Sequence, residues 1–558
     1  PNLGNGNIVR VDKRSNKSNT ADVIDQPAMM QALKYFEALG KEALENYCIG
    51  MDVFLSGVGS LGLQAYQALV DPGGGYTLPY ESFDSNQFKA DLNYVVAHTH
   101  VPQSNDKTVE NINNIDGCIV DVRMSDFITA SHVVGAMEVC NETAETPASS
   151  SILSNERAAF AMGASLAAKQ GLRTNNFPSN NVSDALTRVR MGRYDPLSTL
   201  SFMLRVDEDF SATDDKYAFF QCIVRYVDQD GRDLVTRAST YRLPVAVSIH
   251  DFLDSMDEEV VPVVLGKEAV FRSIIGREDE EAIDALVVDT DRIEMLAFEA
   301  QKDLDNTIHR VSGAYRLIGL EVGTSHKDFV EEGGISSAHS SLGFAFPPEL
   351  ADALHRLFHL RRGSMLSPGP VRSMDDRAGI RNLFLRLPLD DCLCMMAPSL
   401  WSADSIPATS EVLHPIPSDT MTLWDNRIIA ADHHDCLFVW SGKATFDSAH
   451  DHIRERCKEF LLERSRTRFP LPTLYVLQEG DSMSRRFTSR LAPTHADPSE
   501  QQIAHFPDLA TLTPNELAGL IDKFRFYEET VDASFRRWFW SIASASSNSR
   551  NEGMSLCE

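Results

Sequence analysis

The spacing of apolar residues changes several times along this chain, and no internal repeat is visible. Residues 27–96 alternate between helical and strand patterns, residues 118–243 mostly follow the two-residue period of strands, and residues 249–362 are mostly helical. Strands and helices mix again after residue 427. The chain has 558 residues, more than one hydrophobic core can organise, so we expect several domains of different classes.

The first part of the chain predicts an α/β layer. Helical periodicity covers residues 27–47, 63–70 and 83–96, and short apolar strands are expected at residues 49–55 and 76–79. Because helices and strands alternate, the strands should lie parallel in one sheet.

An antiparallel β module is predicted next, with strands at residues 118–124, 132–139, 200–206, 218–227 and 234–243. Asp230-Gly231 lies between the last two strands and is the strongest hairpin signal in the chain. Residues 141–193, rich in Ser, Asn, Thr and Ala, interrupt this module. They predict an insertion loop with at most one helix, near residues 156–169.

The last part predicts helices followed by a smaller α/β unit. A helical segment runs from residue 249 to about residue 320, a Gly/Ser/His-rich linker covers residues 333–343, and a further helix is expected at 348–362. Strands at residues 427–431, 436–440 and 473–478, with helices at 450–465 and 514–542, favour a compact α/β unit.

Charge and cysteine usage exclude some classes of protein. The net charge of −28 argues against a nucleic-acid binder, because phosphate contacts require a basic face. The nine cysteines are scattered without C-x-x-C spacing, which predicts neither a zinc ribbon nor a disulfide framework and favours a reducing cytosol. No apolar run approaches the length of a membrane-spanning helix. The chain begins with Pro1 rather than Met, so we expect a fragment of a longer protein.

Gly57-Val58-Gly59-Ser60-Leu61-Gly62 forms a G-x-G-x-x-G pattern between a predicted strand and a predicted helix, and Glu81 follows the next strand. Such a pattern is typical of dinucleotide sites, where the glycines approach a pyrophosphate and the acid binds the ribose. A cofactor site at Gly57, Gly59, Gly62 and Glu81 would make the chain a nicotinamide-dependent oxidoreductase. The alternative is a Gly-rich turn in another kind of α/β sheet.

Asp432-His433-His434-Asp435, with His450 and His452 nearby, raises the question of a metal site. Adjacent histidines on a strand point to opposite faces, so they do not easily bind one ion. A turn between two strands is the favoured interpretation, and no metal site is predicted.

Three further polar or sulfur-containing pairs have ordinary structural interpretations. Cys392 and Cys394 lie in an apolar run, where free cysteines act as small hydrophobic residues. Arg361-Arg362 follows a predicted helix and suits its negative C-terminal end. Arg485 and Arg486 follow the strand at residues 473–478, where an arginine is usually a solvated surface residue. The alternative for Arg485 is an arginine finger, a guanidinium delivered to a phosphoryl-transfer site on a partner.

Several short segments, in the same order as in the family, give the chain a resemblance to the Sec23 family, the GTPase-activating half of the COPII inner coat. The segments that carry the resemblance are Met51-Asp52-Val53-Phe54, Leu61-Gly62-Leu63, Gly74-Gly75-Tyr76, Ser82-Phe83, Phe88-Lys89, Asp195-Pro196-Leu197-Ser198-Thr199-Leu200, Phe358-His359-Leu360-Arg361-Arg362, Arg427-Ile428-Ile429, Arg468-Phe469-Pro470-Leu471-Pro472, Ser482-x-x-Arg485 and Ser489-Arg490-Leu491-x-Pro493. They span nearly the whole chain.

The resemblance implies a multi-domain fold. Its parts are the second half of an α/β trunk related to von Willebrand factor A domains (1–112), a β-barrel or sandwich containing the 141–193 insertion (113–245), a helical domain (246–387), a gelsolin-like domain (388–545) and a disordered tail (546–558). In this context the glycines at residues 57–62 form a turn of the trunk sheet. The family's zinc ribbon and the first half of its trunk are not matched, so zinc is expected only in a preceding part of the protein.

The function implied is that of a COPII coat subunit in transport from the endoplasmic reticulum to the Golgi. Arg485 corresponds to the finger that activates a Sar-type small GTPase, with no catalytic chemistry of the chain's own. The family usually has an aromatic residue directly after the finger, whereas here Arg486 precedes Phe487, so Arg486 is the alternative.

The expected partners are the Sar-type GTPase, a paralogous cargo-binding subunit in a heterodimer, and outer-coat subunits. The expected location is cytoplasmic, peripheral on the endoplasmic reticulum membrane and on COPII vesicles. No cofactor or metal is expected in residues 1–558. An actin-binding relative of gelsolin remains a further alternative.

Overall fold

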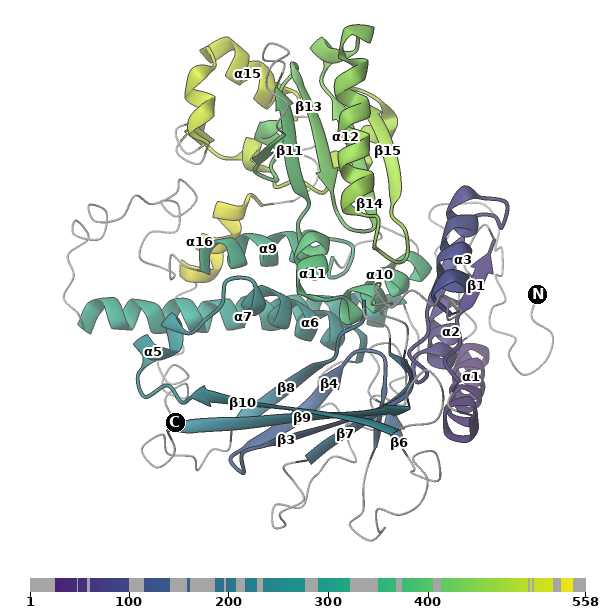
Figure 1. Cartoon of the computed structure of the whole chain (residues 1–558). Coiled ribbons are helices and arrows are strands. Elements are labelled where there is room, and N and C mark those ends of the chain that lie inside the picture. Colours follow the sequence, from purple (N-terminus) through teal and green to yellow (C-terminus); the bar gives the residue numbers. More distant parts are fainter. Residues whose placement is uncertain are drawn as a thin grey trace. The chain divides into compact units, whose positions relative to one another are not determined.

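The computed structural model describes residues 26–47, 49–57, 61–99, 115–140, 158–160, 186–194, 197–206, 216–227, 234–275, 290–321, 350–367, 374–404, 413–499, 502–503, 506–524 and 533–544 (Figure 1). The chain divides into two compact units. The first comprises residues 1–254, 267–300 and 364–388, and the second residues 255–266, 301–363 and 389–558. Helices and sheets occur in both, as the mixed fold class predicts.

The first unit begins with the predicted alternation of helices and strands. The elements are α1 (Gln26–Tyr47), β1 (Val53–Ser56), α2 (Leu63–Val70), β2 (Thr77–Tyr80) and α3 (Asn86–Thr99). Strands β1 and β2 are parallel, with Val53 opposite Thr77. The chain packs closely here, since a Cβ added at Gly75 would lie 1.6 Å from the carbonyl oxygen of Met51. Only glycine fits that position.

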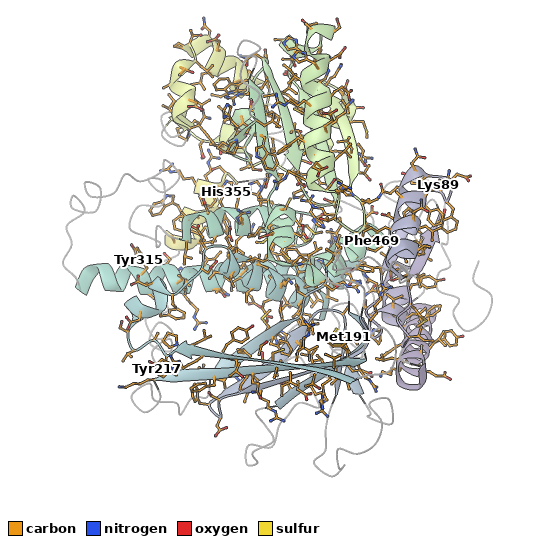
Figure 2. The ribbon with its side chains drawn as sticks, in the orientation of Figure 1. Lys89, Met191, Tyr217, Tyr315, His355 and Phe469 are labelled. Atoms are coloured by element: carbon orange, nitrogen blue, oxygen red, sulfur yellow. The ribbon has the colours of Figure 1, made fainter. Side chains whose placement is uncertain are left out.

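A six-stranded sheet follows in the same unit, in the order β10-β9-β3-β7-β5-β6. Its strands are β3 (Ile115–Met124), β5 (Glu138–Cys140), β6 (Ala158–Phe160), β7 (Leu186–Tyr194), β9 (Tyr217–Val227) and β10 (Leu234–Pro244). Strands β4 (Ile128–Val134) and β8 (Ser201–Val206) form a second, antiparallel pair. Apolar residues of β3, β4, β7, β8 and β9 share one core, which includes Met191 of β7, 2% exposed (Figure 2).

Predicted and observed strands differ most in the 141–193 segment. We predicted a loop with at most one helix near 156–169, and this was wrong for β6 and β7, both of which pair within the sheet. Residues 141–157 and 161–185 lie outside the described part of the chain. The error has a physical cause. The loop prediction rested on the Ser, Asn, Thr and Ala content of the segment, whereas β7 carries Arg188, Arg190 and Arg193, each of which pairs with a carboxylate inside the unit.

The predicted hairpin is confirmed in its strands. β9 and β10 pair antiparallel along their length, with Val227 opposite Leu234. The Asp230-Gly231 turn itself lies outside the described residues.

Helices dominate the chain between the two sheets, as the sequence predicts. They are α5 (Ile249–Asp254), α6 (Val260–Ile275), α7 (Thr290–Glu321), α9 (Ala351–Arg362), α10 (Met374–Arg386) and α11 (Leu389–Met396). Helix α10 belongs to the first unit, α9 and α11 to the second, and α6 and α7 have residues in both. The predicted linker at 333–343 lies outside the described residues.

The second unit contains a five-stranded sheet in the order β12-β11-β13-β14-β15. The strands are β11 (Ser399–Asp404), β12 (His414–Ile416), β13 (Arg427–Asp432), β14 (Cys436–Ser441) and β15 (Thr473–Gln478). Helix α12 (Asp451–Arg464) covers one face, where Cys457 and Leu461 meet β13 and β14 (Figure 1). The predicted strands 427–431, 436–440 and 473–478 and the helix 450–465 are confirmed to within a residue or two.

The opposite face of this sheet packs against the chain after β15. This second core contains Phe438 and Trp440 of β14, Phe487 beyond the sheet and Leu520 of α15 (Pro514–Asp522). The predicted helix 514–542 is instead observed as α15 and α16 (Phe535–Ser544), with residues 525–532 outside the described part. None of the described helices has the length and apolar character needed to cross a membrane.

Candidate functional site

The loop after β15 carries Arg485, the residue that the sequence singles out. β15 ends at Gln478, and Gly480 then adopts a positive φ of 92° that reverses the chain. Asp481 closes the turn: its N–H donates to the carbonyl of Gln478 at 3.1 Å, and its carboxylate accepts from the Gln478 N–H at 3.1 Å. A single 3₁₀ turn (Ser482–Ser484) leads directly into the one-turn helix α13 (Arg485–Thr488).

Phe487 anchors α13 to the sheet. Its side chain is fully buried in the second core, and its ring centroid lies 5.5 Å from that of Phe438. Ser484 Oγ, also buried, donates to the carbonyl of Gln478 at 3.0 Å. Arg485 and Arg486 lie between these two inward-facing residues and are on the outer side of the helix.

Arg485 and Arg486 are both exposed, but their surroundings differ. Arg486 Nη1 donates to the Tyr475 hydroxyl at 3.0 Å, and its guanidinium lies 5.4 Å from the centre of the same ring. Arg486 is therefore held against β15 by a hydrogen bond and a cation–π contact. No hydrogen bond or ion pair reaches the Arg485 side chain from the part of the chain that the structure describes, and the residue is exposed, so its guanidinium faces solvent.

Arg490, two residues beyond α13, connects the helix to the sheet. Its Nε donates to the carbonyl of Arg486 at 3.1 Å, and its Nη1 donates to Asp435 Oδ1 at 3.1 Å and to His433 Nδ1. The guanidinium lies over the Phe438 ring at 5.3 Å. Burial lowers the pKa of Arg490, but the Asp435 carboxylate outweighs burial and raises the pKa overall. The group is therefore charged.

Helix α9 supports the same loop from a second direction. His359 Nδ1 donates to the carbonyl of Arg490 at 3.1 Å, and Arg362 Nη1 donates to that of Leu491 at 3.0 Å. Burial holds the pKa of His359 well below its usual value, so the ring is neutral and its Nδ1 carries the proton. Arg361, which we expected only to complement the helix end, also forms a bidentate pair with Asp305 of α7.

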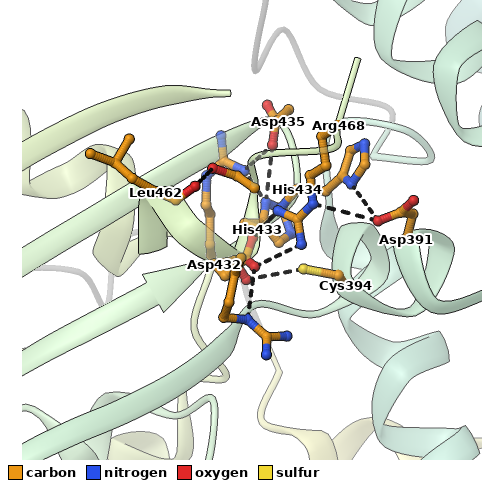
Figure 3. A network of polar contacts seen from close by, with 11 residues as sticks. Asp391, Cys394, Asp432, His433, His434, Asp435, Leu462 and Arg468 are labelled. Carbon is orange, nitrogen blue, oxygen red and sulfur yellow. Dashed lines mark hydrogen bonds and ion pairs between the residues drawn. The ribbon is translucent and has the colours of Figure 1, made fainter. Parts of the chain in front are cut away.

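The turn between β13 and β14 is built on a buried ion pair (Figure 3). Arg468 donates to both carboxylate oxygens of Asp432, at 2.6 and 2.8 Å. Burial raises the pKa of Asp432, but the bonds from Arg468 outweigh burial and hold that pKa below its usual value. Cys394, predicted to be a buried small residue, is buried and donates its S–H to the Asp432 carbonyl at 3.4 Å.

The two histidines of this turn have different partners, as expected for neighbours in a tight turn. His433 contacts Arg490, whereas His434 Nδ1 lies 3.3 Å from Asp391 Oδ1. His434 has a positive φ of 57°, which is uncommon outside glycine and is consistent with the predicted turn. Among the described residues no group of three or more His, Cys, Asp or Glu side chains could hold a metal.

The Gly57–Gly62 pattern has a different environment from that of a dinucleotide site. Residues 58–60 lie outside the described part of the chain, but the start of α2 is described. The Asp375 carboxylate of α10 accepts from the N–H groups of Leu61 and Leu63, the second at 2.9 Å. A carboxylate therefore occupies the positive helix end that a pyrophosphate would need. Glu81 is exposed. The turn interpretation is favoured over the cofactor site.

Sequence reasoning identified Arg485 and Arg486 but missed Arg490, His359 and Arg362 as supports of their loop. In the sequence, Arg490 appears only within a segment that resembles the Sec23 family. The signal that could have found it is its position two residues after a one-turn helix whose last carbonyls need donors. The partners of that side chain, in a turn more than fifty residues earlier, are not visible from spacing.

Comparison with known proteins gives matches that cover nearly the whole chain. Protein transport protein SEC23 A of Arabidopsis thaliana is 26% identical over 517 residues, covering 92% of this chain. The chain spans 47% of that relative's length, about half. The crystal structure of the human COPII-coat protein Sec24c superposes with a TM-score of 0.55 at 14% identity, covering 93% of this chain and 58% of that one. No family model matches the chain.

Sequence similarity along almost the full chain and a shared mixed multi-domain fold agree with each other and with the ordered segments in the sequence. The chain is therefore similar along almost its full length to a Sec23 protein and shares the fold of a Sec24 protein.

Proposed function

We propose that this chain is part of a COPII inner-coat subunit and that Arg485 acts as an arginine finger for a Sar-type small GTPase. The observation that carries the proposal is the placement of Arg485. It is a solvent-facing guanidinium, without a partner in the described part of the chain, on a helix whose other end is buried in a core. The similarity to a Sec23 protein supports the choice of partner.

Such an arginine acts on charge that develops during phosphoryl transfer. As the γ-phosphoryl group leaves, negative charge spreads over its oxygens, and a planar guanidinium can donate to two of them at once. The arginine contributes most when it is already in place, because then no reorganisation is needed at the moment of reaction. The Phe487 anchor and the closed turn at Asp481 supply that preorganisation to α13.

The contacts of the two adjacent arginines support Arg485 over Arg486. Moving Arg486 into a partner's active site would break its hydrogen bond to Tyr475 and its cation–π contact with the same ring. Arg485 has no such bond to lose within the described residues. A residue that is free in the unbound protein reaches a partner at a lower free-energy cost.

Stimulated GTP hydrolysis tests the proposal in the intact subunit with its GTPase. Arg485→Ala should lower the stimulated rate by about 10³-fold, because a finger stabilises mainly the transition state. Affinity for the GTP-loaded partner should change little. Arg485→Lys should rescue poorly, since a flexible point charge lacks the planar fork.

Arg486→Ala is the matched control, one residue away on the same helix. It should keep most of the stimulation. Loss of stimulation in Arg486→Ala with retention in Arg485→Ala would move the assignment to Arg486. Full stimulation in both variants would end the finger proposal, and an inactive wild-type subunit would end the proposed activity.

The remaining features of the proposal follow from the resemblance to the Sec23 family. The subunit would pair with a paralogous cargo-binding subunit, contact outer-coat subunits and bind peripherally to the endoplasmic reticulum membrane on its cytoplasmic side. The trunk, β-barrel, helical and gelsolin-like assignments belong to the same proposal. Structural zinc is expected in a ribbon that precedes this chain in the protein, and elemental analysis of the intact subunit would detect it.

A further inference from the structure

We infer that Arg490 is the positioning residue that sets the orientation of α13 and so of Arg485, an inference that rests on the proposed function. Its guanidinium spans two structures distant in sequence. One side contacts the carbonyl of Arg486 in α13, and the other contacts Asp435 and His433 in the turn before β14.

The helix needs this side chain because it is too short to hold itself. A four-residue helix has few internal hydrogen bonds, and isolated single turns are unstable. The backbone N–H of Arg490 donates to the carbonyl of Phe487 at 3.0 Å rather than to that of Arg486. Arg490 Nε takes the place of a backbone donor at the Arg486 carbonyl. The side chain thus completes the end of the helix that its own backbone leaves open.

The turn that receives Arg490 is a rigid support. Asp432 at its start is locked by the bidentate bond from Arg468, and Asp391 of α11 lies close to both Arg468 and His434. Figure 3 shows these residues converging on the turn from separate segments of the second unit. Arg490 therefore ties α13 to this turn.

Two further bonds restrict how Arg490 itself is placed. His359 and Arg362 of α9 donate to the carbonyls of Arg490 and the following Leu491. The backbone of Arg490 is thus held by α9 and its guanidinium by Asp435. The bonds to α9 and to Asp435 explain how a single surface turn could present Arg485 in a defined orientation.

The consequence for the proposed activity is specific. Weakening the bonds of the Arg490 side chain should misplace Arg485 in the transition state. The surface that binds the GTPase should remain intact. Misplacement of a catalytic group by about 1 Å can lower a rate by roughly 10²-fold. Asp435 would also lose its cation, so a full deletion of the side chain could disturb the turn.

The test uses Arg490→Lys in the intact subunit, because lysine keeps the charge beside Asp435 but cannot also donate to the Arg486 carbonyl in the same geometry. Stimulated hydrolysis should fall by roughly 10- to 100-fold at saturating subunit. Binding to the GTP-loaded partner should be unchanged. Arg466→Lys, an exposed arginine of the same unit paired only loosely with Glu463, is the matched control and should behave as wild type.

Hydrogen exchange on the subunit alone gives a readout that does not depend on the GTPase. Amides of residues 485–491 should exchange faster in Arg490→Lys, while those of β13 and β14 stay protected. Unchanged exchange at 485–491 would overturn the inference, as would faster exchange across the whole sheet, which would indicate a merely structural role. Equal loss of binding and of hydrolysis would also overturn it.

Failure of the proposed function and failure of this inference give different results. If the wild-type subunit stimulates no hydrolysis, the proposed function fails, while the exchange experiment still decides whether Arg490 orients α13. If Arg485→Ala abolishes stimulation and Arg490→Lys leaves both stimulation and exchange unchanged, the finger stands and the positioning role falls.

Discussion

The six-stranded sheet of the first unit and the five-stranded sheet of the second stabilise their central strands with different chemistry. In the second unit, β13 is buried along its whole length and presents Ile428, Ile429 and two alanines to the cores on either face. In the first unit, β7 occupies an equally interior position in its sheet but carries three arginines. The strand is central in both cases. Only β13 has the apolar sequence that is typical of a central strand.

Buried ion pairs make the difference. Arg188 donates to both oxygens of Asp121, Arg190 lies 3.2 Å from Glu138, and Arg193 lies 2.7 Å from Asp52. Burying an unpaired charge costs several kcal/mol. Each of these arginines can be buried because a carboxylate pairs with it. An apolar strand needs no such partner. Its stability is distributed over many weak contacts, whereas that of β7 depends on a few specific pairs.

The largest effect should come from the apolar sheet. Trp440 of β14 is 2% exposed in the second core, and Trp440→Ala should lower the free energy of unfolding by about 3–5 kcal/mol through lost burial and the cavity left behind. Denaturant unfolding followed by a probe in the second unit would measure it. A loss below about 1 kcal/mol would mean that this core collapses around the cavity and is more plastic than its burial indicates.

A somewhat smaller loss of stability is expected in the six-stranded sheet, and a second substitution should restore most of it. Glu138→Ala leaves Arg190 buried without its carboxylate and should cost about 3 kcal/mol. The double variant Glu138→Leu with Arg190→Met should recover most of that loss, because an apolar pair of similar volume avoids the desolvation penalty. If the double variant is as unstable as Glu138→Ala, the Glu138–Arg190 pair stabilises the protein by more than neutralising two buried charges.

Opposite pH trends should distinguish two buried carboxyl groups, one in each unit. Burial raises the pKa of Asp71 in the first unit from 3.8 to about 7, against the opposing charge of Arg386. The stability associated with protonated Asp71 is therefore complete below about pH 4 and is lost as the pH rises through 7. Asp71→Asn should become more stable relative to wild type across this window.

Asp432 in the second unit should respond in the other direction. Its pKa lies below 3.8 because Arg468 outweighs burial, so its contribution is present at neutral pH and lost as the pH falls below about 4. Asp432→Asn should therefore be most destabilised near pH 7 and approach wild type in acid. Hydrogen exchange resolved by unit would record both trends, and parallel pH profiles for the two variants would contradict the assignment.

The smallest effect should come from an exposed ion pair. Arg466 and Glu463 lie 3.9 Å apart with each side chain 77% exposed. Arg466→Ala should change the free energy of unfolding by less than about 0.5 kcal/mol, since solvent screens such pairs. Thermal unfolding would detect a larger change, which would show that burial is not what separates Arg190 from Arg466.

Local patterns determined a large part of the secondary structure. Helix 63–70 and strand 473–478 coincide with α2 and β15, and the strands that became β13 and β14 were predicted to within a residue. These elements are predictable because their apolar periodicity reflects burial on one or both faces. The turn at Asp432–Asp435 was also predictable, since polar residues there interrupt two apolar strands.

The surroundings of Arg485 could be predicted only in part from the sequence. The sequence indicated a loop arginine after a strand, and the resemblance to the Sec23 family suggested a role for it. Spacing does not distinguish Arg485 from Arg486, and the structure adds only that the Tyr475 hydroxyl bonds the guanidinium of Arg486. Both arginines have the same local sequence signal.

The sequence by itself determined the helices and strands whose stability comes from apolar burial, and the order of short segments gave a resemblance to a multi-domain family. Only the tertiary structure decided that an arginine-rich segment is a central strand and that Arg490 connects α13 to a turn formed more than fifty residues earlier. The physical reason is the same in both cases. Apolar burial leaves a periodic pattern along the chain, whereas a buried charge is stabilised by one partner whose position depends on the fold.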